Sequence, residues 1–383
     1  MNKVKSIDIT KGISVFFIIF LNSVNYWLIV NEDLKYIIAY IAILSEIFGS
    51  MLFIFTYSFE TIFTLQKMIG SPPEKTYRNQ IFKRGFLFIL LGLIYNLIVN
   101  LFNNFTLRIW GWNIILFIGF AQIIVYFSFK LIRWARLVIG LSILIFTPIL
   151  REFLYFNKDN NILFEVLYLV IISPDPSFCL LPYASFCFFA SIFSELIYQA
   201  YALENKRALS ISIKSTLRYG FMFIIAGFVL SLTDFNPLIT PTFYDALKYP
   251  FIDGNPILRY YTFQYIPYMP EFLLEGTSAY ILFIIGIFII ILVCVFYFSE
   301  ISPKNSRICY GINYYGENSL TLIFMQYIFL PLFIIRIHIF VFFPLYLLFI
   351  TLLSYLIYIW KKYTNGKYNI EWIIEKATIK EGS

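Results

Sequence analysis

Long apolar runs separated by short polar segments dominate the pattern of this chain. A helix that spans a membrane needs about 20 apolar residues, and ten runs approach that length. The pattern therefore predicts an all-α fold, a polytopic transmembrane helical bundle of about ten spans over 1–362 with a short tail at 363–383. The runs lie at 13–30, 37–65, 86–101, 113–129, 137–154, 178–199, 219–233, 272–298, 319–335 and 339–360.

Composition supports the membrane as the solvent of this protein. Of 383 residues, 60% are hydrophobic and only 13% are charged, and a soluble protein of this length could not bury so much apolar surface. We therefore expect a multi-pass protein of the cell membrane, with membrane lipids as partners. The net charge of +7 indicates basic loops that face anionic lipid, not binding to nucleic acid. Four cysteines without a CxxC pair and a single histidine predict no metal site.

The distribution of basic residues predicts the orientation. With the N-terminus in the cytoplasm, 22 of the 29 lysines and arginines fall on the inner side of the ten predicted spans. Cytoplasmic segments carry such an excess, so both termini are predicted to be cytoplasmic. On the outer side, the 11-residue stretch "ILFEVLYLVII" is too short to span. The long outer loop 234–271 is either a lid that binds an acceptor or a structured cap without chemistry.

Polar residues inside the predicted spans are candidates for function, because a charge in the membrane is costly. Glu46 and Glu60 are fourteen residues apart, which would place both on one face of a regular helix. The alternative for Glu60 is an ordinary position at the cytoplasmic interface, and Glu46 is the better candidate. Asn22 lies late in the first span and is either a site residue or an interhelical hydrogen-bonding group. The same two readings apply to Asn25, Asn96, Asn100 and Gln326.

Charged residues at the predicted cytoplasmic ends could bind phosphate. Asp8 and Lys11 lie one turn apart before the first span, where they either pair with each other or help to hold a phosphate-rich ligand. Arg84 belongs to a basic segment between the second and third spans, which suits an anionic ligand but also fits the ordinary excess of cytoplasmic charge. The other basic residues of this segment are Lys67, Lys75, Arg78 and Lys83.

Six segments, in order, resemble the heparan-alpha-glucosaminide N-acetyltransferase-like family of membrane acyltransferases. In the first segment Ser6, Asp8 and Gly12 match the family pattern, with Lys11 where arginine is usual. In the last, Gly316, Asn318, Ser319 and Leu320 match. The segments are "SIDITKGISVFFIIFLN", "MLFIFTYSFETIFTL", "YRNQIFKRGFLFILLGLIYN", "NIILFIGFAQIIVYF", "FCLLPYASFCFFASIF" and "YGENSLTLIFMQYIF".

The resemblance implies a bundle that takes an acyl group, usually acetyl, from acetyl-CoA on the cytoplasmic side. The group is delivered to a sugar or lipid-linked glycan on the outer side. On this basis Asp8, Lys11, Arg84 and Asn318 are the expected acetyl-CoA-binding residues. The resemblance leaves the oligomeric state open, and a homo-oligomer is compatible with it.

This chain departs from the family in its catalytic base. Family members carry a histidine in the outer loop after the first span, where this chain reads "NSVNYWLIVNEDLKY". Acyl transfer needs a group that takes the proton of the acceptor, and the carboxylates Glu46, Asp33 and Glu32 are the local candidates. Asn22 would then bind the thioester carbonyl. The missing histidine also favours an alternative, a non-catalytic relative that acts as a transporter, flippase or assembly partner.

Overall fold

The computed structural model describes most of the chain, and its described part is almost entirely helical. The described residues are 4–29, 35–69, 73–102, 111–172, 179–203, 205–232, 270–273, 276–301, 307–329 and 336–378. Among them, the only extended pairing is an isolated bridge between Leu28 and Ile337. The predicted all-α class is confirmed, while the outer loop 234–271 and the candidate base Asp33 lie almost wholly or wholly outside the described residues.

Seven helices are long and apolar enough to cross a membrane, and each coincides with a predicted span. The segment Tyr40–Met68 joins α2, a π turn η2 and α3 into one helix. The protein is therefore a membrane protein. These helices are α1 (Lys5–Trp27), α2 (Lys35–Glu46) with η2 (Ile47–Met51) and α3 (Leu52–Met68), α4 (Glu74–Phe102), α6 (Arg133–Asn157), α9 (Lys206–Leu230), α12 (Ser278–Phe296) and α15 (Ile339–Thr364).

The other three predicted spans are shorter helices. They are α5 (Ile114–Phe129), α8 (Ser185–Ala202) and α14 (Ser319–Phe329). The short stretch after α6 forms α7 (Ile162–Leu167) and a π turn η3 (Tyr168–Ile172), so it is helical and too short to span, as predicted. A one-turn helix η5 (Glu271–Leu273), a π turn η6 (Tyr297–Ile301), α13 (Arg307–Glu317) and α16 (Ile370–Thr378) complete the described elements.

Side-chain caps explain where several helices begin. The Asn113 side chain accepts hydrogen bonds from the backbone N–H groups of Ile115 and Leu116, each at 2.9 Å. Asn205 caps α9 and Thr277 caps α12 in the same way. Because the first N–H groups of a helix have no partner within it, such caps define the N-terminal boundary.

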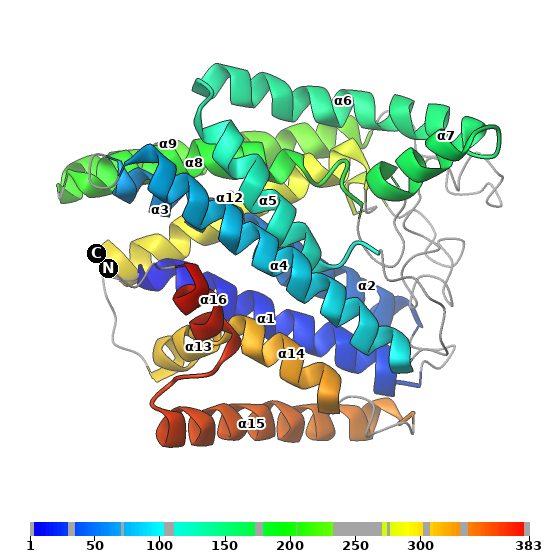
Figure 1. The fold of residues 1–383 in the computed structure, drawn as a ribbon, viewed down its shortest axis with the longest axis vertical. Coiled ribbons are helices and arrows are strands. Elements are labelled where there is room, and N and C mark those ends of the chain that lie inside the picture. Colours follow the sequence, from blue (N-terminus) through cyan, green and yellow to red (C-terminus); the bar gives the residue numbers. More distant parts are fainter. Residues whose placement is uncertain are drawn as a thin grey trace.

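The helices form layers across the bundle, with α6 at one edge and α15 at the other (Figure 1). Apolar side chains on α6, α9 and α15 are largely exposed, for example Ile145, Phe221 and Phe340. In a membrane protein such faces contact lipid. The helices between these edges, above all α1 and α3, are the most buried.

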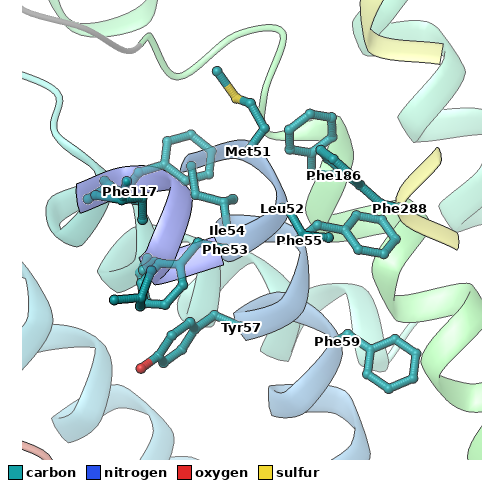
Figure 2. Packing of buried hydrophobic residues seen from close by; sticks show 14 of the residues in the cluster. Met51, Leu52, Phe53, Ile54, Phe55, Tyr57, Phe59, Phe117, Phe186 and Phe288 are labelled. Carbon is teal, nitrogen blue, oxygen red and sulfur yellow. The ribbon is translucent and has the colours of Figure 1, made fainter. Parts of the chain in front are cut away.

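Residues 52–59 of α3 are buried on all sides and form the centre of the core (Figure 2). Phe55 packs against Phe186 of α8 and Phe288 of α12, with ring centroids 6.4 and 5.6 Å apart. A helix that is hydrophobic all round is expected to be buried. Among the labelled side chains, Tyr57 carries a hydroxyl group, and Figure 2 shows it directed away from the aromatic cluster. The Tyr57 side chain also lines the candidate site.

Candidate functional site

A cavity of about 390 Å³ opens at the end of the bundle where α1 begins. Its walls come from α1, α3, α4, the junction of α13 and α14, and α16. We call it the ionic cavity, because eight of its lining side chains are acidic or basic. These are Asp8, Lys11, Glu60, Lys67, Arg84, Glu317, Glu371 and Glu375.

Two glycines bring α1 and α13 together beside this cavity. A Cβ atom on Gly316 would lie 1.7 Å from the backbone oxygen of Asp8, and one on Gly12 would lie 2.0 Å from that of Ile312. No side chain fits at either contact, because a backbone carbonyl cannot move aside as a flexible side chain can. The two helices therefore meet backbone to backbone, which holds Asp8 and Lys11 at the cavity wall.

Lys11 is the centre of the charge network in the ionic cavity. Its Nζ lies 2.7 Å from Glu60 and 3.8 Å from Asp8, and its side chain is only 7% exposed. The same atom lies 4.5 Å from the centroid of the Tyr57 ring, a cation–π distance. Asp8 and Lys11 therefore pair, as one of the two readings of the sequence expects, and Glu60 is a second and closer partner that the sequence did not indicate.

Arg84 extends this network from α4. Its guanidinium lies 3.8 Å from Glu60, while its buried Nε has no hydrogen-bond partner among the residues that the structure describes. A guanidinium offers five N–H donors, so the contact with Glu60 leaves Arg84 with donors for an anionic ligand.

The tail helix α16 forms one wall of the cavity through Glu371. The Glu371 carboxylate accepts hydrogen bonds from the backbone N–H groups of Leu320 at 2.7 Å and Thr321 at 3.2 Å, at the N-terminus of α14. It also accepts one from the Thr321 hydroxyl. Burial raises the pKa of Glu371, and these hydrogen bonds oppose that effect in part. The segment predicted as a tail is therefore helical, and its helix packs onto the bundle.

A second polar cluster lies farther along the same helices. The Tyr327 side chain of α14 lies close to those of Asn22 and Tyr95, with its ring centroid 4.7 Å from that of Tyr95, and it is near enough to Glu46 and Tyr26 to interact with them electrostatically. Glu46 is buried, with 7% of its surface exposed. We call this group, Asn22, Tyr26, Glu46, Tyr95 and Tyr327, the Asn22 cluster.

The π turn η2 separates the roles of Glu46 and Glu60. The prediction that Glu46 and Glu60 lie on one helix face assumed a regular α-helix. In the structure, Ile47–Met51 forms a π turn directly after Glu46. A π turn carries about one residue more than an α turn, so it rotates Glu46 away from the face that Glu60 occupies. Glu60 lines the ionic cavity, and Glu46 joins the Asn22 cluster.

The ionic cavity does not reach the Asn22 cluster. Asn22 and Glu46 are absent from its described lining, which instead includes Asp8, Lys11 and Arg84 as expected for the donor side. Eleven residues of α1 separate Lys11 from Asn22, about 16 Å along a helix. The structure thus groups the predicted residues into two sites.

Asn318 has a local structural role. Its amide donates to the Tyr314 carbonyl at 2.9 Å, and its side-chain oxygen accepts from Asn369 at 3.2 Å. It does not line the ionic cavity, although its neighbour Ser319 does. Asn318 therefore joins α13, α14 and the start of α16.

Several residues of these two sites were not singled out from the sequence. They include Tyr57 and Glu371 in the ionic cavity and Tyr327 in the Asn22 cluster. The Tyr57 and Ser319 hydroxyl oxygens lie 3.3 Å apart, which joins α3 to α14. The spacing of Tyr57, Glu60, Thr64 and Lys67 within an apolar run was the available signal, because residues three and four apart share a helix face.

Asn96 has a structural role in joining two helices. Its amide nitrogen donates to the Gly111 carbonyl at 2.8 Å, and its oxygen accepts from Asn113 at 2.7 Å. Asn113 also donates to the Gly92 carbonyl at 2.8 Å. Both hydrogen-bonding ends of the Asn96 amide are therefore used to join α4 to the start of α5, which supports the interhelical reading of this residue.

Comparison with known proteins adds no family to this description. No model of a known protein family matches the sequence, and no match is found among curated proteins. The resemblance to membrane acyltransferases therefore stays a prediction that depends on the six segments quoted above.

Proposed function

We propose that this protein is a membrane acyltransferase of the cell membrane. In this proposal it takes an acyl group, most simply acetyl, from acyl-CoA in the cytoplasm and transfers it to a sugar or lipid-linked glycan on the outer side. The observation that carries the proposal is the placement of two polar sites on the same helices. The ionic cavity lies at the end that the basic residues assign to the cytoplasm, and the Asn22 cluster lies deeper along α1 and α14.

Arg84 and Lys11 are the proposed ligands for the phosphates of CoA. Charge-assisted hydrogen bonds from arginine suit phosphate oxygens well, and Arg84 has an unused buried donor. Lys11 is held by Glu60 and Asp8, so binding of a phosphate would require Glu60 to give up part of that contact. Asp8 positions Lys11 in this scheme.

Glu46 is the proposed base in the Asn22 cluster. The acceptor oxygen or nitrogen attacks the thioester carbonyl carbon, a new C–O or C–N bond forms, and the C–S bond breaks. Glu46 takes the proton of the acceptor and passes it to the departing CoA thiolate, so that charge and atoms balance. Asn22 orients the cluster through its contact with Tyr327. Asp33 stays a second candidate base.

One observation favours the alternative of a non-catalytic transporter or flippase. The described lining of the ionic cavity ends before the Asn22 cluster, and acyl transfer requires a passage for the pantetheine arm between them. A transporter would use the cavity as a binding site that opens to one side.

Binding and turnover of acetyl-CoA by the purified protein in detergent test the proposal. We expect acetyl-CoA to bind and free CoA to be released, faster when a sugar acceptor is present. The Arg84→Gln variant should weaken binding by roughly tenfold or more, since a hydrogen bond to a charged group contributes about 1.5–3 kcal/mol. Lys83→Gln is the matched control, because Lys83 is the exposed neighbour of Arg84 on the same helix. Binding without any release of CoA would support the transporter, and absence of binding would overturn both assignments of the cavity.

A further inference from the structure

Gln326 is a fully buried side chain without a hydrogen-bond partner among the described residues. It lies on α14 with 0% of its surface exposed, and neither its amide nitrogen nor its amide oxygen is hydrogen-bonded to any residue that the structure describes. A buried polar group without a partner destabilises a protein by about 1–3 kcal/mol. Because such groups are rare in native proteins, the position of this one needs an explanation.

The position of Gln326 relates it to both polar sites. It is seven residues, or close to two full turns, beyond Ser319, so the two side chains leave α14 from the same face. Ser319 lines the ionic cavity and contacts Tyr57. Gln326 also directly precedes Tyr327, the residue that holds the Asn22 cluster together. Its amide therefore lies at the depth of the Asn22 cluster, on the face that begins at the ionic cavity.

Two other amides near these sites have hydrogen-bond partners. Asn318 is hydrogen-bonded to Tyr314 and Asn369, and Asn96 to Gly111 and Asn113. Among the described residues, Gln326 is the amide on α14 that keeps both a donor and an acceptor for a ligand.

We propose that Gln326 is a catalytic residue that binds the acyl thioester, an inference that rests on the proposed function. Its Nε2–H donates to the carbonyl oxygen of the acyl group and stabilises the negative charge that develops there during attack. Its Oε1 accepts from the amide N–H that pantetheine carries next to its sulfur. The role of oxyanion donor, expected for Asn22 from the sequence, passes to Gln326, and Asn22 positions Tyr327.

Replacement of Gln326 by methionine tests this role with little change of volume. We expect Gln326→Met to lower kcat for acetyl transfer by about 100-fold, the usual effect of losing one oxyanion donor, and to raise KM for acetyl-CoA by a smaller factor, because the hydrogen bonds to the bound donor are lost. Gln122→Met is the matched control. Gln122 is also buried with both amide atoms unpartnered, but it lies on α5 and lines neither site, so its kcat should equal that of the wild type.

An infrared measurement separates a catalytic from a structural role. With acetyl-CoA labelled with carbon-13 at the carbonyl, hydrogen bonding from Gln326 should shift the carbonyl stretch of the bound thioester to lower frequency. The shift should disappear in Gln326→Met and persist in Gln122→Met. A folded Gln326→Met variant with wild-type kcat and an unchanged carbonyl band would overturn the inference and leave the proposed function intact. A wild-type protein that neither binds nor cleaves acetyl-CoA would overturn the proposed function, and the inference with it.

Discussion

The ionic cavity and the Asn22 cluster share α1, α4 and α14 but differ in charge and in access to solvent. The cavity holds paired acids and bases and reaches the surface at the exposed Glu375. The Asn22 cluster consists of amide and phenol groups around one carboxyl group, Glu46. Charged groups therefore gather where water or a charged ligand can reach them, and uncharged hydrogen-bonding groups gather deeper in the bundle.

This difference follows from the cost of charge in a low-dielectric medium. A buried ion pair is tolerated only with good geometry and further hydrogen bonds, and Lys11 has a 2.7 Å contact with Glu60 and a neighbouring aromatic ring. The Asn22 cluster avoids this cost, since it holds a single carboxyl group among uncharged amide and hydroxyl groups. In the proposed function the first site binds the charged donor and the second carries out the transfer.

The sharpest test of this division of roles removes the carboxyl group of Glu46. Glu46→Gln should lower the rate of acetyl transfer by about 100- to 10,000-fold, the contribution of a general base, and leave acetyl-CoA binding unchanged. Turnover and binding are measured on the same detergent preparation. Glu152→Gln, at an exposed position of α6, is the control. Equal turnover of Glu46→Gln and the wild type would remove the catalytic role of this cluster.

The next test removes the cation at the centre of the ionic cavity. Lys11→Met removes the nearest cation from Glu60 and Asp8, and breaking a buried pair in this way destabilises a protein by about 3–5 kcal/mol. The free energy of unfolding in detergent should fall accordingly. The double variant Lys11→Met/Glu60→Met should lose less stability than Lys11→Met alone, because the Glu60 carboxylate no longer stays behind without the 2.7 Å contact to Lys11. A larger loss in the double variant would contradict this account of the network.

The close contact of α1 with α13 beside the ionic cavity can be tested at Gly316. Gly316→Ala places a Cβ atom 1.7 Å from the Asp8 backbone oxygen, so α1 and α13 must separate, at a cost of about 1–3 kcal/mol. Gly311→Ala on the same helix is the control, because nothing lies within 4 Å of a Cβ atom there. We expect the apparent melting temperature to fall for Gly316→Ala and to stay or rise for Gly311→Ala. Similar melting temperatures for both variants would refute the close contact.

The smallest expected effect concerns Glu371 on α16. Burial raises its folded-state pKa above the ordinary value of 4.5, so the folded protein retains this proton to a higher pH than the unfolded chain. Stability should therefore decrease as pH rises from about 4.5 through the folded-state pKa and then level off. Glu371→Gln should flatten this part of the profile, measured as melting temperature against pH. An unchanged profile would show that Glu371 is not its source.

The sequence by itself determined the class of the protein and most of its helices. The apolar runs and the low share of charged residues are enough to predict a membrane bundle, because a soluble protein of this length could not bury so much apolar surface. The 3.6-residue period also predicted that Asp8 and Lys11 lie close enough to pair. The distribution of basic residues predicted that Lys11 and Arg84 lie on the same side of the membrane, and both line the ionic cavity.

Only the tertiary structure decided how the polar residues divide into two sites. The π turn after Glu46 changes the helix phase, and no periodic pattern in the apolar run indicates it. Contacts between distant segments, such as Lys11 with Glu60 and Leu320 with Glu371, depend on how helices pack. Likewise, Gln326 and Asn96 look alike in sequence, and only the packing around each amide leaves one satisfied and the other without a partner.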